Sequence, residues 1–132
     1  MLASKKLETK ILVVDDEREI REMLVDFLKE AGYEVFEAGS GSAALKAVNE
    51  FKPDLVMLDI ILPDVDGVSV YEDLRSKKAT SKVPVIFFTA LGEGIPPTFS
   101  RQMESAPYSL IPKPVNTSVL LEEVERLLKP AA

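Results

Sequence analysis

Five residues with reactive side chains each follow, or lie at the end of, a short apolar run of the sequence. They are the carboxylates Asp15, Asp16 and Asp59, the hydroxyl of Thr89 and the ammonium group of Lys113. Carboxylates that crowd together raise one another's pKa unless a cation lies between them. Three acids at one site therefore predict a hard divalent metal ion with oxygen ligands, for which Mg²⁺ is the natural candidate and Mn²⁺ an alternative.

The apolar runs beside these residues have the length and composition of buried strands. Ile11–Val14 precedes the pair of acids, Leu55–Leu58 precedes Asp59, and residues 83–88 precede the threonine. Two weaker stretches of β-forming residues, 33–38 and 108–111, complete the set. Turn-forming residues follow Asp59, so we expect this acid at the carboxyl end of a strand and facing a loop.

Segments with a helical pattern alternate with these runs. Apolar residues recur with a helical period over 20–31, and shorter helical patterns cover 42–49, 68–77 and 117–129. Between 91 and 107 the signal is weakest, and only Phe99 and Met103 suggest one short helix. This alternation predicts an α/β fold of five parallel strands and five helices with right-handed crossovers. Ligands bind such sheets at the carboxyl ends of the strands, where the reactive residues should meet.

Each of these residues also has an ordinary structural interpretation. Asp15 or Asp16 taken alone is more often a helix cap than a metal ligand. Thr89 is a β-forming residue in a strand, and a lysine between prolines, such as Lys113, is usually a solvated surface residue. The joint pattern favours a site, because independent accidents would have to place acid, acid, hydroxyl and ammonium at different strand ends.

The composition limits the classes of protein. A chain of 132 residues with 46% hydrophobic and 29% charged residues is typical of a single globular domain. The net charge of -6 argues against direct contact with nucleic acid, which requires clustered Lys and Arg. The absence of Cys and His excludes disulfides, thiolate nucleophiles and imidazole bases. No apolar run approaches the length of a membrane span, and residues 1–10 are charged, so we expect a cytoplasmic protein without membrane contact.

The motifs around the reactive residues form a recognisable set. It consists of Val13–Asp16, Met57–Asp59, Pro63, Asp66–Gly67, Thr89–Ala90 and Lys113–Pro114. As a set it resembles the receiver domain of two-component response regulators, the family of the chemotaxis protein CheY. The resemblance covers residues 10–129, which leaves 1–9 as an N-terminal extension and 130–132 as a C-terminal tail. It implies a flavodoxin-like, CheY-like doubly wound sheet of five parallel strands in the order 2-1-3-4-5.

The resemblance implies a phosphorylation switch. Asp59 would accept a phosphoryl group from a phosphohistidine of a sensor histidine kinase or phosphotransfer protein, or from acetyl phosphate. Lys113 would neutralise a phosphoryl oxygen, and Thr89 would donate a hydrogen bond to the phosphoryl group. The implied ligands of Mg²⁺ are Asp15, Asp16, Asp59 and the backbone carbonyl of Ile61.

Further positions follow from the same resemblance. Pro114 would follow a cis bond that aims Lys113 inward, and Gly67 would serve the turn between strand and helix. Thr89 and Leu110 would be the switch positions, whose movement repacks a protein-interaction face. Receivers of this kind often form homodimers through the last two helices and the last strand.

The sequence departs from the family pattern at several positions. Leu110 stands where the family usually has an aromatic residue, and Pro96–Pro97 interrupts the segment of the fourth helix. We therefore expect the output face to move differently from the common pattern. Ile61 and Leu91 lie two residues past the acceptor acid and the threonine, where polar side chains tune hydrolysis in the family. Apolar side chains at these positions would keep an attacking water away from the phosphoryl group, so we predict slow autodephosphorylation.

Two other functions stay open. A magnesium-dependent phosphatase also forms an aspartyl phosphate, but it carries two aspartates two residues apart, whereas Glu17 stands two residues past Asp15 here. A receiver-like interaction module that is never phosphorylated is disfavoured by the intact set of reactive residues. On the favoured interpretation the chain catalyses only its own phosphorylation and dephosphorylation and is not a multiple-turnover enzyme. The sequence is compatible with a stand-alone regulator and with a receiver taken from a longer chain.

Overall fold

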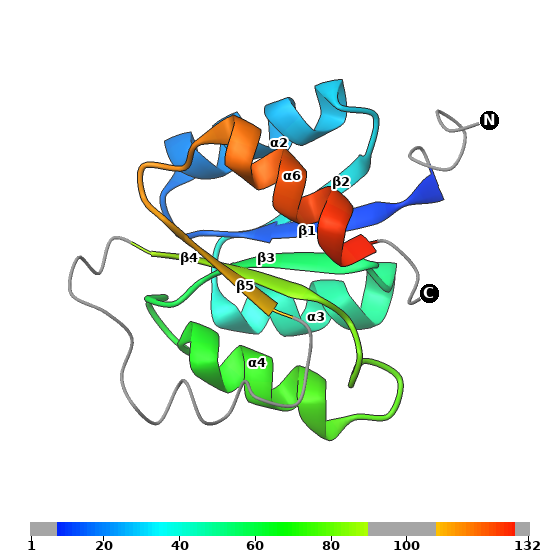
Figure 1. Ribbon diagram of the computed structural model, residues 1–132. Helices are drawn as coiled ribbons and strands as arrows, with labels where there is room; N and C mark the ends of the chain where they lie inside the picture. Colours follow the sequence, from blue (N-terminus) through cyan, green and yellow to red (C-terminus); the bar gives the residue numbers. More distant parts are fainter. Residues whose placement is uncertain (1–7, 90–107, 129–132) are drawn as a thin grey trace.

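A computed structural model describes residues 8–89 and 108–128 of the chain (Figure 1). The strands are β1 (Lys10–Val14), β2 (Glu34–Ala38), β3 (Leu55–Asp59), β4 (Val85–Thr89) and β5 (Tyr108–Pro112). The helices within the described residues are α2 (Arg18–Glu30), α3 (Gly41–Phe51), α4 (Gly67–Ser76) and α6 (Thr117–Leu128). From β1 to β4 strands and helices alternate, as the hydrophobic pattern predicts.

The strands form one parallel sheet in the order β2-β1-β3-β4-β5. The predicted fold class, a CheY-like flavodoxin fold, is therefore confirmed. The chain passes from β1 to the edge strand β2 and then returns across β1 to β3. This reversal of strand order places the carboxyl ends of β1 and β3 side by side, at the position where open α/β sheets bind ligands.

Helices cover both faces of the sheet (Figure 1). Helices α2 and α6 pack on one face, and α3 and α4 pack on the other. Successive side chains of a strand point to opposite faces. Accordingly Ile11 and Val13 pack with α2 and α6, whereas Leu12 and Val14 pack with α3 and α4. A strand buried on both faces needs apolar residues at every position, which explains the continuous apolar runs of the sequence.

The ends of the elements follow local residue preferences. Gly32, just past α2, adopts a φ of 104°, a left-handed conformation that glycine allows without strain. Ser40 caps α3 by accepting a hydrogen bond from the Ala43 N–H. Pro84 precedes the first residue of β4, so that no hydrogen bond of the sheet is lost.

One predicted element falls on residues that the structure does not describe. The short helix expected between 91 and 107, with the Pro96–Pro97 interruption and part of the predicted dimer face, lies outside the described residues. None of the described helices has both the length and the apolar character needed to cross a bilayer.

Candidate functional site

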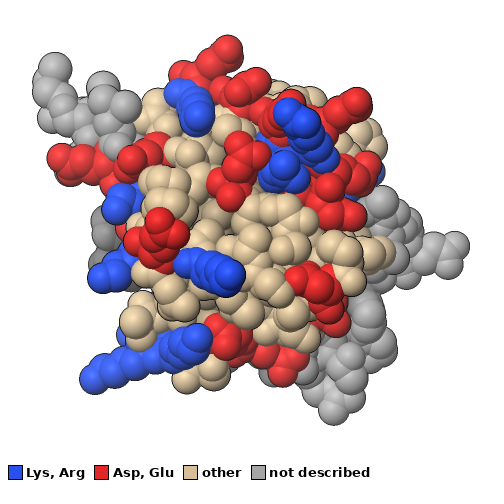
Figure 2. All heavy atoms as spheres, turned by 180° about the vertical axis from the view of Figure 1, so that it is seen from behind, with Lys and Arg blue, Asp and Glu red and all other residues tan. Residues whose placement is uncertain are grey.

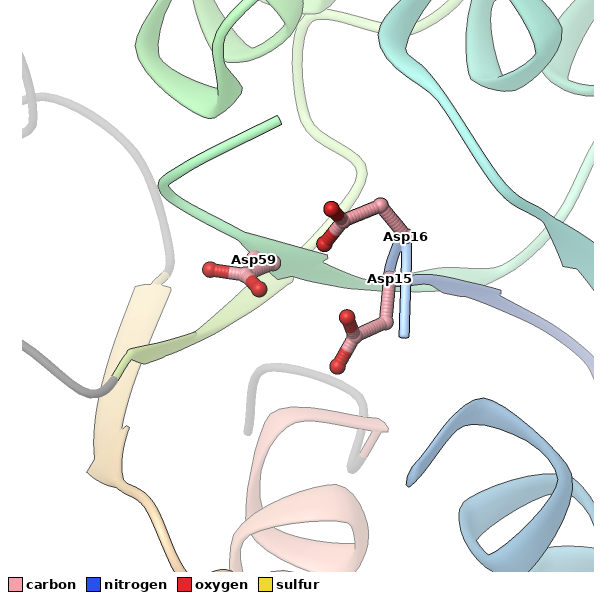
Figure 3. A group of neighbouring side chains, drawn as sticks. All are labelled: Asp15, Asp16 and Asp59. Atoms are coloured by element: carbon pink, nitrogen blue, oxygen red, sulfur yellow. The ribbon is translucent and has the colours of Figure 1, made fainter. Parts of the chain in front are cut away.

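The acidic residues converge because the strands that precede them are neighbours. Val14 pairs with Leu58 in the β1–β3 register, so Asp15 and Asp59 lie at the same level of the sheet. Asp15, Asp16 and Asp59 each offer an oxygen atom, and these atoms all lie within 4.8 Å of one another. Figure 3 shows the three carboxylates side by side at the ends of β1 and β3. Asp15 and Asp59 are buried, whereas Asp16 is exposed.

Lys113 brings a positive charge to these carboxylates from the segment after β5. Its backbone N–H donates a hydrogen bond to the carbonyl of Thr89 at 2.9 Å, and its peptide bond to Pro114 is cis. The Lys113 Nζ donates to Asp59 Oδ2 at 2.9 Å and lies 3.1 Å from Asp15 Oδ2. Because the Lys113 side chain is only 9% exposed, little solvent screens this attraction.

Burial and the ion pair shift two pKa values at the site. Burial has the largest effect on Asp15 and raises the pKa of its carboxyl above the ordinary value, against the opposing effects of the Glu17 N–H and Lys113. Burial alone would lower the pKa of Lys113, but its hydrogen bonds and its attraction to Asp59 and Asp15 raise that pKa above the ordinary value. Lys113 is therefore a fixed cation beside Asp59.

The oxygen atoms of the three aspartates fit a hard metal ion. Asp15 Oδ2 is buried and has no hydrogen-bond partner among the described residues, although the Lys113 ammonium lies at ion-pair distance. The single positive charge of Lys113 offsets only part of the repulsion among the three carboxylates, and a bound cation would offset more of it. Carboxylate oxygens are the ligands that Mg²⁺ and Mn²⁺ prefer. The residues present therefore suit an ion of this class.

The other predicted site residues lie in or beside the same part of the sheet. Thr89 is the buried last residue of β4. Leu110 is a half-buried residue of β5 that packs against the core on the face of the sheet covered by α3 and α4. The Ile61 N–H donates to Asp59 Oδ1 at 3.0 Å. A Cβ atom on Gly67 would lie 2.2 Å from the Asp59 carbonyl oxygen, so the return of the chain over β3 requires a glycine.

Two residues that support the site were not predicted from the sequence. Glu17 donates its N–H to Asp15 Oδ1 at 2.8 Å, and its Oε1 lies 3.2 Å from the Lys113 Nζ. Arg21 donates from Nη1 to the Asp15 carbonyl at 2.9 Å and pairs through Nε with Glu37 Oε1 at 2.8 Å. Glu17 directly follows Asp15 and Asp16 in the sequence, and this position could have identified it as a candidate site residue. No local signal marks Arg21, because its partner Glu37 lies 16 residues away on β2.

Replacing Arg21 by alanine is expected to lower the free energy of unfolding by about 1–2 kcal/mol, through the loss of charged hydrogen bonds. The Arg21 side chain is 18% exposed and links the Asp15 carbonyl to Glu37. Urea unfolding followed by circular dichroism measures the change. Arg18→Ala is the matched control, because Arg18 pairs with Glu22 while 80% exposed, and such surface pairs contribute little. Equal losses in the two variants would contradict the prediction.

The chain matches curated response regulators over almost its whole length. It is 38% identical over 125 residues to the transcriptional regulatory protein ResD of Bacillus subtilis, a match that covers 95% of this chain and 50% of ResD. It is 36% identical over 123 residues to the DNA-binding response regulator MtrA of Mycobacterium tuberculosis, covering 93% of this chain and 52% of MtrA. The chain therefore spans about half the length of these relatives.

These relatives correct our prediction about nucleic acid. The net charge of -6 led us to exclude direct contact with nucleic acid. On the face shown in Figure 2, Lys and Arg side chains indeed lie among Asp and Glu side chains rather than in one basic patch. MtrA, however, is a DNA-binding response regulator, and this chain matches about half of it. The exclusion is wrong, because the charge of one segment says nothing about contacts made elsewhere in a regulator.

The family match and the solved structures agree with the fold. The family profile of the response regulator receiver domain matches residues 11–125. The chemotaxis protein CheY4 of Vibrio cholerae is similar with a TM-score of 0.80 and 28% identity, covering 91% of this chain and 98% of CheY4. The receiver domain of the Francisella response regulator 1452 is similar with a TM-score of 0.78 and 27% identity, covering 91% and 96%. By its profile match, its curated relatives and its strand order, the chain belongs to the response regulator receiver domain family.

Proposed function

We propose that this receiver domain, which we place at residues 10–129, accepts a phosphoryl group on Asp59 in a two-component phosphorelay. The observation that carries the proposal is the position of the Lys113 Nζ, 2.9 Å from Asp59 Oδ2, at a site where Asp15 and Asp16 also meet Asp59. Phosphoryl transfer depends mainly on positioning and charge neutralisation. A nucleophile, a fixed cation and metal-ligating oxygens are the groups that it requires.

In the proposed step a carboxylate oxygen of Asp59 attacks the phosphorus of a phosphohistidine on a sensor histidine kinase or phosphotransfer protein. The new P–O bond forms as the P–N bond breaks, and the bonding electron pair leaves with the imidazole nitrogen, which then takes up a proton. With acetyl phosphate as the donor, a P–O bond breaks and acetate leaves. The product in both cases is an aspartyl phosphate.

We assign the binding of Mg²⁺ to Asp15, Asp16, Asp59 and the backbone carbonyl of Ile61, with Mn²⁺ as an ion that the same ligands accept. Such an ion supplies positive charge that offsets the repulsion between the acceptor carboxylate and the phosphoryl oxygens. The contribution of the chain is to hold the carboxylates together, which the register of β1 and β3 supports.

Lys113 and Thr89 are proposed to contact the phosphoryl group. The Lys113 ammonium would offset the charge of one phosphoryl oxygen, and the Thr89 hydroxyl would donate a hydrogen bond to another. The hydrogen bond from the Lys113 N–H to the Thr89 carbonyl ties the two segments together, so a shift of Thr89 would also move the chain after β5. Leu110 pairs with Phe87 on β4, and we assign Thr89 and Leu110 as the switch positions of a protein-interaction face.

The same proposal covers turnover, location and output. The domain would catalyse only its own phosphorylation and dephosphorylation, and so would not be a multiple-turnover enzyme.

We place it in the cytoplasm, where a histidine kinase obtains ATP. We propose an output in transcriptional control, because ResD is a transcriptional regulatory protein and MtrA a DNA-binding response regulator.

Incubation with acetyl phosphate and Mg²⁺, followed by mass measurement of the intact protein, tests the proposed function. We expect one phosphoryl group per chain, and none when EDTA removes the metal. An aspartyl-phosphate phosphatase would instead release phosphate from p-nitrophenyl phosphate over many turnovers. A chain that gains no mass at any concentration of Mg²⁺ would contradict the proposal and favour an interaction module that is never phosphorylated.

The phosphorylated domain is expected to lose its phosphoryl group slowly, over minutes or longer. Ile61 lies beside the acceptor with an apolar side chain that is 56% exposed and cannot orient an attacking water. Leu91, the other residue on which this prediction depends, lies outside the described residues. Decay of the phosphorylated mass after removal of acetyl phosphate measures the half-life.

Ile61→Asn should shorten that half-life, because an amide can hold a water molecule near the phosphorus. Val119→Asn is the control, since Val119 is similarly exposed at 42% but lies on α6. A wild-type half-life of seconds, or equal half-lives in the two variants, would contradict the prediction.

A further inference from the structure

The loop between β3 and α4, residues 60–66, is bound to α3 through one side chain. Asp64 Oδ1 accepts hydrogen bonds from the Gly41 N–H at 2.9 Å and from the Val65 N–H at 2.7 Å. Asp64 Oδ2 accepts from the Ser42 N–H at 3.2 Å and from the Ser42 hydroxyl. A helix leaves its first N–H groups without intrahelical partners. At the start of α3, a residue of a distant loop supplies two of those partners.

The backbone of this loop also lies directly against α3. A Cβ atom on Gly41 would lie 2.2 Å from the carbonyl oxygen of Val65 and 2.6 Å from its Cβ. The positive end of the helix dipole attracts the Asp64 carboxylate. Hydrogen bonds, the one from the Ser42 hydroxyl first, lower the pKa of Asp64 below its ordinary value. The link between the loop and α3 is therefore close and consists of hydrogen bonds to a charged carboxylate.

The same loop carries the groups of the site that follow Asp59. The Ile61 N–H donates to Asp59 Oδ1 at 3.0 Å, and the Ile61 carbonyl is a proposed metal ligand. At the far end of the loop the Gly67 N–H donates to the Ile60 carbonyl at 2.8 Å. The loop is thus bound to β3 through Ile61 and closed by the bond between Gly67 and Ile60, and Asp64 ties its middle to α3.

We propose that Asp64 is a positioning residue for the metal site. The N-terminus of α3, acting through Asp64, holds the loop where the Ile61 N–H bonds to Asp59 and where the Ile61 carbonyl would be available to a metal ion. The inference rests on the proposed function, since it concerns the metal ligands of the phosphorylation site. Asp64 itself is not a ligand in this proposal, so its replacement weakens metal binding through the position of Ile61.

Titration of the chain with Mn²⁺, followed by the electron paramagnetic resonance signal of the free ion, tests the proposal without any phosphoryl donor. Asp64→Ala is expected to weaken Mn²⁺ binding by about tenfold, the loss typical of residues that orient metal ligands. Asp64→Asn keeps one acceptor oxygen and should give a smaller loss. Asp16→Asn removes a proposed ligand and should weaken binding at least as much as Asp64→Ala.

Ser40→Ala is the matched control. Ser40 caps the same helix by accepting a hydrogen bond from the Ala43 N–H at 3.1 Å, within α3 itself. Its replacement should destabilise the start of α3, as loss of a cap does, while Mn²⁺ binding stays within about twofold of the wild type. Comparing Ser40→Ala with Asp64→Ala therefore distinguishes the effect of a destabilised α3 on Mn²⁺ binding from the effect of a displaced loop.

Linkage provides a second measurement on the unmodified chain. If α3 positions the metal site, metal binding must stabilise the contact with α3 by the same coupling free energy. Saturating Mg²⁺ should therefore slow hydrogen exchange of the Gly41 and Ser42 amides, which donate to Asp64. Should Asp64→Ala fail to fold, this measurement still decides the question.

The outcomes separate this inference from the proposed function. Three results would overturn the inference and leave the proposed function intact. They are unchanged Mn²⁺ affinity in Asp64→Ala, an equal loss of Mn²⁺ affinity in Ser40→Ala, and rates of amide hydrogen exchange at Gly41 and Ser42 that do not change with Mg²⁺. A wild-type chain that binds no Mn²⁺, or an Asp16→Asn variant that binds it normally, would overturn both.

Discussion

An Asp59→Asn variant is expected to gain no phosphoryl group under conditions that phosphorylate the wild-type chain. An asparagine amide is not a nucleophile toward phosphorus, and the change removes one of three carboxylates whose oxygens lie within 4.8 Å of one another. The amide oxygen of the introduced asparagine can still accept the hydrogen bond from the Ile61 N–H, so the fold should persist. Intact mass after incubation with acetyl phosphate measures the loss, and circular dichroism verifies the fold.

Asp66→Asn is the matched control for this variant. Asp66 lies in the same loop, and its Oδ1 accepts from the Ser69 N–H at 2.8 Å at the start of α4. Asparagine caps a helix about as well as aspartate, so Asp66→Asn should be phosphorylated as the wild type is. A phosphoryl group found on the Asp59→Asn chain, at Asp15, Asp16 or any other residue, would contradict the assignment of the acceptor.

Gly67→Ala is expected to lower the free energy of unfolding by about 3 kcal/mol, the upper end of the cost of an overpacked site. The added Cβ would lie 2.2 Å from the Asp59 carbonyl oxygen and 2.8 Å from the Ile60 Cα. Both are backbone atoms, so the end of β3 or the start of α4 must move. Because the displaced residue is the proposed phosphoacceptor, phosphorylation by acetyl phosphate should slow as well. Urea unfolding and the rate of mass gain measure the two effects.

Gly39→Ala provides the comparison. A Cβ on Gly39 would lie 3.3 Å from Arg21 Nη1, a side-chain atom that needs to shift by only a few tenths of an ångström. We expect a change in the free energy of unfolding of less than about 1 kcal/mol for this variant. If Gly67→Ala were as stable as Gly39→Ala and as readily phosphorylated, close packing of Gly67 on Asp59 would have no energetic consequence.

The buried strands explain why much of the fold followed from the sequence. Every residue of β3 and β4 is buried, so each strand appears in the sequence as a continuous run that a polar residue ends. A polar residue at the end of such a run must lie at the carboxyl edge of the sheet. That Asp15, Asp59 and Thr89 lie at one edge of the sheet could therefore be predicted from hydrophobic pattern and chain direction, whereas the order of their strands came from the resemblance to receiver domains.

The limits of the elements were predicted less well. The apolar run 83–88 suggested a strand from Val83, whereas β4 begins at Val85, where it pairs with Val56 of β3. Hydrophobicity reports burial, and the residues just before a strand can be partly buried without joining the sheet. Strand limits depend on pairing with a neighbour, which a single segment does not encode.

The sequence by itself determined the fold class and picked out the candidate site residues, because burial and turn preference follow from local patterns and because the motifs resemble those of receiver domains. The tertiary structure alone decided which distant groups support them. Glu17 reaches Lys113 across 96 positions of the chain, and Asp64 reaches Gly41 across 23. Such contacts depend on how helices and loops pack over the sheet, and a hydrogen bond between two distant segments changes the periodic pattern of neither.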